Sequence, residues 1–386
     1  MLPKLAIITT HPIQYNAPIF KMLTERKKVE VKVFYTWEQS KEEVYDPLFK
    51  RIIKWDLPLL EGYEYSFLRN KAKEPGSHHF WGINNPDIKE QILDYEPSAI
   101  LVFGWSYISH LKVLKYFSGK IPIIFRGDST LMNEEVGLKR LLRKLFLTWV
   151  YRHITKALFV GKKNEEYYLR FGVKPEQLVF APHAVENDRF QGNSNSSSQI
   201  NWREKLMIPE SATVLLFAGK FEPRKNPFLL ISAFKELKST NMHLVMVGNG
   251  DFEKELKQQS ADVSNIHYLD FQNQQNMPSI YKMADVFVLP SKSETWGLAV
   301  NEAMACGSAV LVSDKCGCSV DLVDPGVNGY IFESDNKNDL LEKLAFYEKA
   351  SKDSISKMGL ASQDKIQEWS FESICSTVES LKIKNA

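Results

Sequence analysis

The stretch that decides the fold is "VFVLPSKSETWGLAVNEAMACG", residues 286–307. Its apolar beginning predicts a buried strand, the polar middle predicts a loop, and the Ala-rich end predicts a helix that Gly307 can terminate. A buried strand that leads through a short loop into a helix is the repeating unit of a parallel sheet covered by helices. This stretch therefore indicates an α/β protein.

Strand-like runs of the same kind recur in both halves of the chain. In the N-terminal half they are 4–10, 29–35, 99–103, 121–125, 156–161 and 178–185, and in the C-terminal half 213–220, 242–248, 265–270, 286–290, 309–314 and 329–332. Longer amphipathic stretches separate most of them, which favours parallel sheets with helices on both faces. The polar run "QGNSNSSSQI", residues 191–200, interrupts this alternation and is typical of a linker.

The length of 386 residues and the hydrophobic content of 44% are enough for two cores. We predict two doubly wound, Rossmann-like α/β domains, over 1–187 and 204–368, that face each other across a cleft. A linker loop over 188–203 joins them, and 369–386 contains one more amphipathic helix that can pack on either domain. Ligands in such sheets bind at the carboxyl ends of the strands, so the cleft is the expected site.

Composition excludes several classes of protein. The formal net charge is +2, without the basic excess of a nucleic-acid-binding protein, so we expect no nucleic-acid partner. The four cysteines lack the spacing of a zinc site and are interpreted as reduced thiols of a cytoplasmic protein. No apolar run is long enough to span a membrane, and 4–10 is interpreted as a first strand rather than a signal sequence.

Two carboxylates lie around the start of the predicted helix. Glu294 precedes the helix and Glu302 stands about one turn inside it. The backbone N–H groups of Gly297, Leu298 and Ala299 have no intrahelical acceptor and would bind phosphate oxygens. A carboxylate accepts two hydrogen bonds at once, as a sugar diol requires, so this arrangement describes a nucleotide-sugar site. The alternative is an ordinary helix whose first turns carry Glu because of the helix dipole.

A basic loop, "FAGKFEPRKNPF" over residues 217–228, follows the first strand of the C-terminal half. Gly219 ends that strand, and Lys220, Arg224 and Lys225 would neutralise a diphosphate. The alternative is a solvated basic loop. Gly248 begins a Gly-Asn-Gly turn after the next strand, and it is either a further donor contact or the residue that a tight turn requires.

Polar side chains also follow two strands of the N-terminal half. "TTHPIQYNAPIF", residues 9–20, and "IIFRGDST", residues 123–130, would present them to the cleft. These candidates for the acceptor side are His11, Gln14, Tyr15, Asn16, Arg126 and Asp128. A structural role in the strand ends is the alternative.

The stretch 137–153 predicts an amphipathic helix with a basic first half. Its basic side chains are Lys139, Arg140, Arg143 and Lys144, and leucines and aromatic residues surround them. Such a helix either lies on an anionic membrane surface or is a domain helix with a basic outer face. We therefore expect a cytoplasmic protein with possible peripheral contact to the cytoplasmic face of a membrane.

The motifs over residues 178–370 resemble those of the retaining GT-B glycosyltransferases, the glycosyl transferases group 1 (glycosyltransferase family 4). The matching strings include "AGKFEPRKNP", "LVMVGNGDFEKEL", "SETWGLAVNEAMACG" and "DLVDPGVNGYIF". The resemblance implies a GT-B fold whose final helix crosses back to the N-terminal domain. It implies that Glu294 contacts the donor sugar, that Glu302 contacts the ribose, and that Lys220 and Lys225 hold the diphosphate.

The sequence departs from this family in the N-terminal half. Many members carry a His after a strand like 121–125, where this chain has Arg126, Gly127 and Asp128. Either Asp128 or Arg126 takes the role of that His, or the role falls to another residue. No Asp-x-Asp tripeptide occurs, so we expect no metal and no cofactor besides the nucleotide-sugar substrate.

The resemblance implies transfer of a sugar from a nucleoside-diphosphate sugar to a hydroxyl of a saccharide or lipid-linked acceptor. We expect front-face transfer, because no enzymic nucleophile is evident, and a role in surface polysaccharide or glycolipid synthesis. Two alternatives remain open. One is a GT-B-like nucleotide-sugar epimerase, which uses the same cleft without an acceptor, and the other is a non-catalytic nucleotide-sugar-binding protein.

Overall fold

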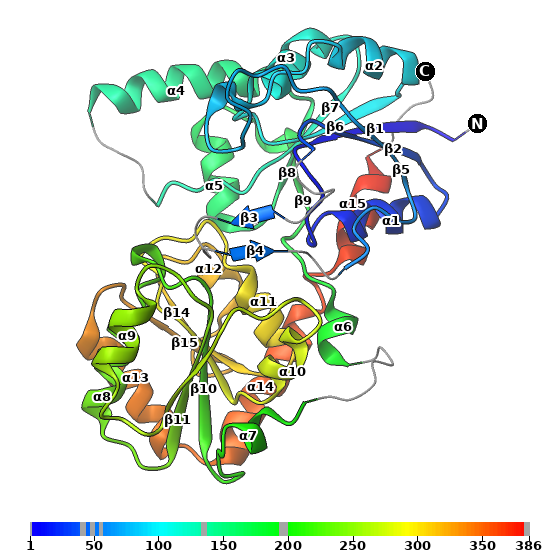
Figure 1. Cartoon of the computed structure of the whole chain (residues 1–386). Helices are drawn as coiled ribbons and strands as arrows, with labels where there is room; N and C mark the ends of the chain where they lie inside the picture. Colours follow the sequence, from blue (N-terminus) through cyan, green and yellow to red (C-terminus); the bar gives the residue numbers. More distant parts are fainter. Residues whose placement is uncertain are drawn as a thin grey trace. The chain divides into compact units, whose positions relative to one another are not determined.

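A computed structural model describes residues 2–38, 44–46, 51–53, 57–132, 137–192 and 200–381 (Figure 1). Its contacts divide the chain into two compact units. Unit 1 comprises Met1–Val44, Pro58–Pro182 and Phe371–Ala386, and unit 2 comprises Tyr45–Leu57 and His183–Ser370. The middle of the predicted linker, 193–199, lies outside the described residues. The predicted ranges of two independently folding domains stay a prediction.

Unit 1 is built on a seven-stranded parallel sheet in the order β5-β2-β1-β6-β7-β8-β9. The strands are β1 (Lys4–Thr9), β2 (Glu30–Tyr35), β5 (Glu64–Phe67), β6 (Ala99–Phe103), β7 (Ile123–Arg126), β8 (Lys156–Phe159) and β9 (Leu178–Phe180). The inner strands are buried on both faces, which explains their continuous apolar sequences. All seven carboxyl ends lie along one edge because the strands are parallel.

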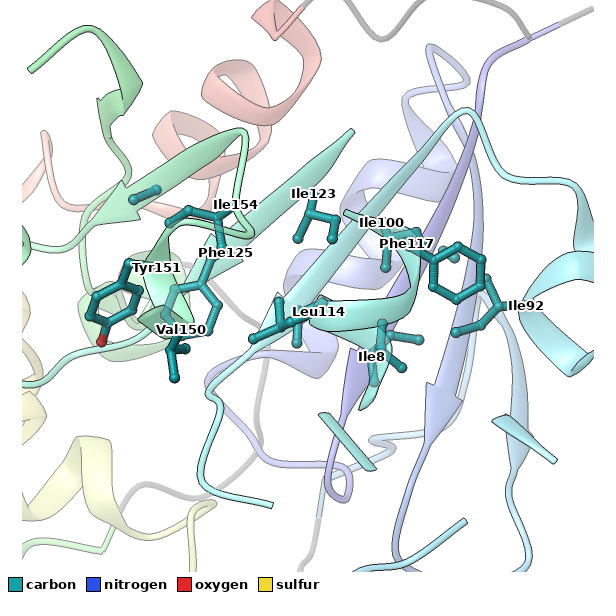
Figure 2. Packing of buried hydrophobic residues seen from close by; sticks show 14 of the residues in the cluster. Ile8, Ile92, Ile100, Leu114, Phe117, Ile123, Phe125, Val150, Tyr151 and Ile154 are labelled. Atoms are coloured by element: carbon teal, nitrogen blue, oxygen red, sulfur yellow. The ribbon is translucent and has the colours of Figure 1, made fainter. Parts of the chain in front are cut away.

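The helices of unit 1 are α1 (Ala17–Glu25), α2 (Ile88–Tyr95), α3 (Ile108–Phe117), α4 (Leu138–Tyr151), α5 (Lys162–Arg170) and α15 (Phe371–Ser380), with 3₁₀ turns η1 (Phe80–Gly82) and η2 (Pro175–Gln177). Figure 2 shows part of the core, where Ile100 and Ile123 of the sheet lie near Leu114 and Phe117 of α3.

The last described helix, α15, packs against α1 of unit 1. Arg26 at the end of α1 lies 2.6 Å from a carboxylate oxygen of Glu372, and Lys28 lies 2.9 Å from Glu379. Cys375 is fully buried against the backbone of α1. The chain therefore returns to the first unit after completing the second.

Unit 2 contains a six-stranded parallel sheet in the order β12-β11-β10-β13-β14-β15. The strands are β10 (Thr213–Ala218), β11 (Met242–Val247), β12 (Ile266–Leu269), β13 (Val286–Leu289), β14 (Ala309–Ser313) and β15 (Gly329–Phe332). A separate two-stranded sheet is formed by β3 (Val44–Asp46) and β4 (Arg51–Ile53).

The helices of unit 2 are α6 (Asn187–Gln191), α7 (Trp202–Lys205), α8 (Pro227–Leu237), α9 (Glu253–Gln259), α10 (Met277–Lys282), α11 (Leu298–Ala305), α12 (Ser319–Leu322), α13 (Lys337–Lys349) and α14 (Lys352–Ile366), with the 3₁₀ turn η3 (Pro223–Lys225). The prediction of two parallel α/β units is confirmed. Each run predicted as a strand contains one, and α11 ends before Gly307, whose φ of 84° is left-handed.

A buried histidine connects strand ends in unit 1. His110 of α3 places Nδ1 3.0 Å from the carbonyl oxygen of Phe103 and Nε2 3.0 Å from the hydroxyl of Thr36. Burial lowers the pKa of His110 to about 4. The folded chain therefore holds this imidazole neutral at neutral pH.

This burial predicts acid sensitivity. The unfolded chain takes up a proton at His110 near its ordinary pKa of 6.5, whereas the folded chain does so only near 4. The free energy of unfolding should therefore fall as the pH drops through this window, by up to about 1.4 kcal/mol per pH unit for this one residue. Urea denaturation at several pH values should give a shallower pH dependence for His110→Gln than for the wild type. Parallel pH profiles of the two proteins would contradict this account.

Candidate functional site

The loop between β13 and α11 is fixed by a second loop that follows β14. The N–H of Glu294 donates to the carbonyl of Lys315 at 3.0 Å, and the N–H of Gly317 donates to the carbonyl of Glu294 at 2.9 Å. A Cβ at Gly317 would collide with the carbonyl of Thr295, so only glycine fits there. The backbone that carries Glu294 is therefore held from both sides.

The basic loop after β10 reaches the same place. The N–H of Lys292 donates to the carbonyl of Arg224 at 2.8 Å, which joins the two loops through their backbones. Nζ of Lys225 lies 2.5 Å from Oε2 of Glu294. The side chains are 14% and 13% exposed, so this ion pair is largely withdrawn from water. Two residues predicted separately from the sequence are thus in direct contact.

Glycines allow the ends of β10 and β11 to approach closely. The N–H of Gly219 donates to the carbonyl of Val247 at 3.0 Å. Gly248 has a φ of +133°, and a Cβ there would collide with the carbonyl of Gly219. Gly248 is therefore required by this backbone contact, and its role as a donor contact stays a prediction. A Cβ at Gly219 would lie 3.8 Å from Cε of Lys225, which places the lysine beside this turn.

The N-terminus of α11 lies next to the ion pair. Gly297 is the N-cap with a φ of 109°, and no side chain caps the helix. The N–H groups of Leu298 and Ala299 have no intrahelical acceptor and carry the positive end of the helix dipole. A Cβ at Gly297 would lie 3.5 Å from Cγ of Glu294, so the acidic side chain stands at the helix start. This helix end can bind an anion.

The second acid, Glu302, is buried inside α11 with 4% exposure. Its Oε2 accepts a hydrogen bond of 2.7 Å from the hydroxyl of Tyr281 in α10. Tyr281 is 1% exposed and packs edge-on against Phe190 and Phe287. The hydroxyl therefore orients the carboxylate through a charge-assisted bond.

The other basic candidates of unit 2, Lys220 and Arg224, differ in their exposure. Lys220 is half-buried and has interactions of its own within the chain. The guanidinium of Arg224 is exposed and lies 3.2 Å from a carboxylate oxygen of Glu222. The carbonyl of Arg224, rather than its side chain, connects it to the loop that carries Glu294.

The candidates after β1 in unit 1 are half-buried. Burial lowers the pKa of His11 to about 4, and the ring packs edge-on against Trp37. Nδ1 of His11 is buried without a hydrogen-bond partner among the described residues. Gln14 and Tyr15 follow it, and Asn16 stands at the N-cap of α1 without capping it through its side chain. Their acceptor role stays a prediction.

Arg126 has a structural role in unit 1. It is 4% exposed, and its two terminal nitrogens donate to the carbonyls of Ala181 and Pro182 at 2.8 Å each. Burial lowers the pKa of Arg126 to about 10, and the nearby Asp128 partly offsets this. These two bonds use two of the five N–H donors of the guanidinium. Asp128 is half-buried, and its catalytic role stays a prediction.

Sequence reasoning missed three residues that position the site. Tyr281 occupies an apolar position of a helix, and nothing in the sequence marks its hydroxyl. Gly317 lies between Cys316 and Cys318, and that local sequence does not indicate its close approach to the carbonyl of Thr295. Asn301 accepts from Nε1 of Trp296 at 2.9 Å and donates to the carbonyl of His183 at 3.0 Å, which holds α11 against the residues before α6. Buried contacts over such distances in sequence leave no local signal.

Comparison with known proteins identifies this part of the chain. Residues 198–361 match the family described as Glycosyl transferases group 1. A lipopolysaccharide 1,2-N-acetylglucosaminetransferase of Salmonella typhimurium is 35% identical over 145 residues, which cover 34% of this chain and 38% of that relative. The C-terminal half of this chain is thus similar to the glycosyl transferases group 1 family. The matches span about two-fifths of the length of the curated relatives, at 38% to 43%.

Solved structures share the fold of this chain over almost its whole length. A glycosyltransferase from Rickettsia africae has a TM-score of 0.74 at 14% identity and covers 100% of both chains. The Anabaena protein HepE, solved in complex with UDP and glucose, has a TM-score of 0.70 at 17% identity and covers 98% of both chains. At these identities the likeness shows the fold alone, and it confirms the GT-B fold class.

Within 2–38, 44–46, 51–53, 57–132, 137–192 and 200–381, no group of three or more His, Cys, Asp or Glu side chains is arranged to hold a metal ion. In the same residues, every helix is too short or too polar to cross a membrane.

The burial of the Lys225–Glu294 pair predicts strong coupling between its members. Removing one charge leaves the other largely buried and unpaired, whereas the double variant Lys225→Met/Glu294→Gln removes both. A double-mutant cycle measured by urea denaturation should give a coupling free energy of about 1–3 kcal/mol.

The matched control is Lys257 and Glu253, an ion pair in α9 whose side chains are 47% and 29% exposed. Its coupling should be about 0.3–0.5 kcal/mol. Equal coupling free energies in the two cycles would mean that burial does not strengthen the Lys225–Glu294 pair.

Proposed function

We propose that this chain is a retaining, metal-independent glycosyltransferase. It moves a sugar from a nucleoside-diphosphate sugar to a hydroxyl of a saccharide or lipid-linked acceptor, in the cytoplasm, for surface polysaccharide or glycolipid synthesis. The observation that carries the proposal is the Lys225–Glu294 pair beside the free N-terminus of α11. It lies within the family match, and the Salmonella relative is named a lipopolysaccharide sugar transferase. Peripheral membrane contact through 137–153 belongs to the proposal.

Different groups of unit 2 bind the diphosphate, the sugar and the ribose of the donor. The N–H groups of Leu298 and Ala299, with Lys225 and Lys220, take the diphosphate. Glu294 then accepts hydrogen bonds from the sugar hydroxyls, and Glu302 accepts them from the ribose. The bound diphosphate gives the ammonium of Lys225 a second anionic partner, which releases Glu294 in part toward the sugar.

Transfer proceeds on the face of the sugar from which the diphosphate leaves. The acceptor oxygen forms a bond to the anomeric carbon while the bond from that carbon to the phosphate oxygen breaks. The leaving phosphate takes the proton of the acceptor hydroxyl, so configuration is retained and no enzymic nucleophile is needed. Fixed donors aimed at the charge that develops on the leaving group are worth about 3–4 kcal/mol each in other enzymes.

The proposal has two alternatives, and product analysis distinguishes them. An epimerase would isomerise the donor without an acceptor, and a non-catalytic binding protein would hold the donor without turnover. A thermal-shift screen of UDP- and GDP-sugars first identifies the donor, because a ligand that binds the native state raises the melting temperature.

The labelled donor is then incubated with the protein and with candidate saccharide and lipid-linked acceptors. We expect label in the acceptor, retention of configuration, and no loss of transfer with a chelator. Glu294→Gln should lower turnover at least about 100-fold with an unchanged circular dichroism spectrum. The control Glu253→Gln, in α9, should transfer normally. Near-normal transfer by Glu294→Gln would remove this residue from the donor site.

The Tyr281–Glu302 hydrogen bond predicts that loss of the Tyr281 hydroxyl weakens only the recognition of the ribose hydroxyls. Tyr281→Phe keeps the buried ring but removes the hydroxyl that orients the carboxylate, so it should weaken binding of a nucleoside diphosphate by about 3–30-fold. Calorimetry with UDP, or with GDP if the screen selects it, and with the corresponding 2′-deoxynucleotide should show that the variant discriminates less between the two. If both ligands lose affinity equally, Tyr281 does not act through a ribose contact.

A further inference from the structure

The N-terminal half of α4 exposes large apolar side chains. The exposed fractions are 72% for Leu138, 53% for Leu141, 59% for Leu142, 62% for Leu145 and 39% for Phe146. Single exposed leucines are common on protein surfaces, but five large apolar residues within nine positions of one helix form a continuous patch. Figure 1 shows this half of α4 extending beyond the neighbouring helices of unit 1.

The patch lies on the face of α4 that points away from the core. Leu138, Leu142 and Leu145 are spaced four and three residues apart and share one side of the helix. Leu147 and Val150, which are fully buried, lie about half a turn away from that side. The second half of α4 thus packs on unit 1 through one face while the first half presents a leucine stripe on the other. A core role for the stripe is excluded by this geometry.

Basic side chains flank the stripe on both sides. Lys139 and Arg143 lie toward one flank, Lys144 lies toward the other, and Arg140 lies opposite the stripe. The sequence from Leu138 to Tyr151 contains no Asp or Glu. Arg143 and Lys144 are exposed. The helix therefore combines an apolar edge with positive flanks, the pattern of helices that lie in a membrane interface.

We propose that α4 binds an anionic phospholipid surface, with Leu138, Leu141, Leu142 and Leu145 entering the boundary of the acyl chains. The exposed Arg143 and Lys144 contact headgroup phosphates, which their long stems allow them to reach. A second copy of this chain is a poor occupant, because it would bring an equally positive face against this one. The inference rests on, and specifies, the membrane contact of the proposed function.

This binding is peripheral and reversible. A short leucine stripe and a few cations give modest affinity, so salt weakens the electrostatic part while the apolar part remains. Attachment through α4 would hold unit 1 against the lipid surface, where a lipid-linked acceptor is found.

Vesicle flotation of the full-length protein tests the proposal without any nucleotide sugar. The vesicles are phosphatidylcholine alone and phosphatidylcholine with about one-third phosphatidylglycerol. The wild type should bind the anionic vesicles at least about tenfold more strongly. Leu141→Gln/Leu142→Gln/Leu145→Gln should lose this binding at least about tenfold. Arg143→Glu/Lys144→Glu should lose it similarly at low salt.

Matched controls separate the site from general effects. Met207, Val327 and Leu360 are 87%, 58% and 57% exposed in unit 2, so Met207→Gln/Val327→Gln/Leu360→Gln changes apolar surface of the same kind. Lys238→Glu/Lys349→Glu alters two exposed lysines and shifts the formal net charge from +2 to −2, as the α4 charge variant does. Both controls should float like the wild type, and circular dichroism should confirm that all variants are folded.

Three results would overturn the proposal. The first is that the wild type does not bind anionic vesicles, and the second is that the leucine variant binds them normally. The third is that the wild type forms a concentration-dependent dimer which the leucine variant loses, while the variant keeps its vesicle binding. Thermal shifts with the nucleotide sugar should be equal in the wild type and the α4 variants. A protein that floats but never binds a nucleotide sugar would contradict the proposed function while leaving this inference intact.

Discussion

The ion pair between Lys225 and Glu294 connects two loops that leave neighbouring strands of one parallel sheet. β10 pairs directly with β13 in parallel, so both strands end at the same edge of the sheet. The loops that follow the two strands meet at that edge. Backbone bonds hold both loops, and the start of α11 lies against the acidic partner. The strand order of the sheet therefore brings the two loops together, and the charged side chains can pair only because of it.

The pair also underlies the proposed response of the site to an anion. The two charges are largely withdrawn from water and lie in direct contact, so loss of either partner would leave the other charge largely buried. In the proposed function, a diphosphate at the helix N-terminus would add a second negative partner for the ammonium, and the carboxylate would then turn to a sugar. Glu302 is different, because the hydroxyl of Tyr281 already fixes its carboxylate in one orientation. The proposed donor site would thus contain one acid that exchanges partners and one that is held in place.

The sequence predicted the strands well because burial on both faces leaves continuous apolar runs. It missed β5, an edge strand whose Glu64 and Tyr65 are exposed and give no such run. It placed Lys225 and Glu294 at strand ends, but their contact follows from strand order, which local patterns do not specify. It left two interpretations of 137–153, a helix on a membrane surface and a domain helix with a basic outer face, and it did not indicate that the leucines in the first half of α4 are exposed. The bonds of Arg126 to Ala181 and Pro182 also join distant residues, so the sequence left both an acceptor contact and a structural role open for Arg126.

A crystal structure with a bound nucleoside diphosphate, UDP or GDP as the thermal shifts direct, tests the central claim most directly. The account predicts the diphosphate at the N–H groups of Leu298 and Ala299, with Nζ of Lys225 on a phosphate oxygen. A diphosphate bound elsewhere, with the lysine still paired only to Glu294, would contradict it.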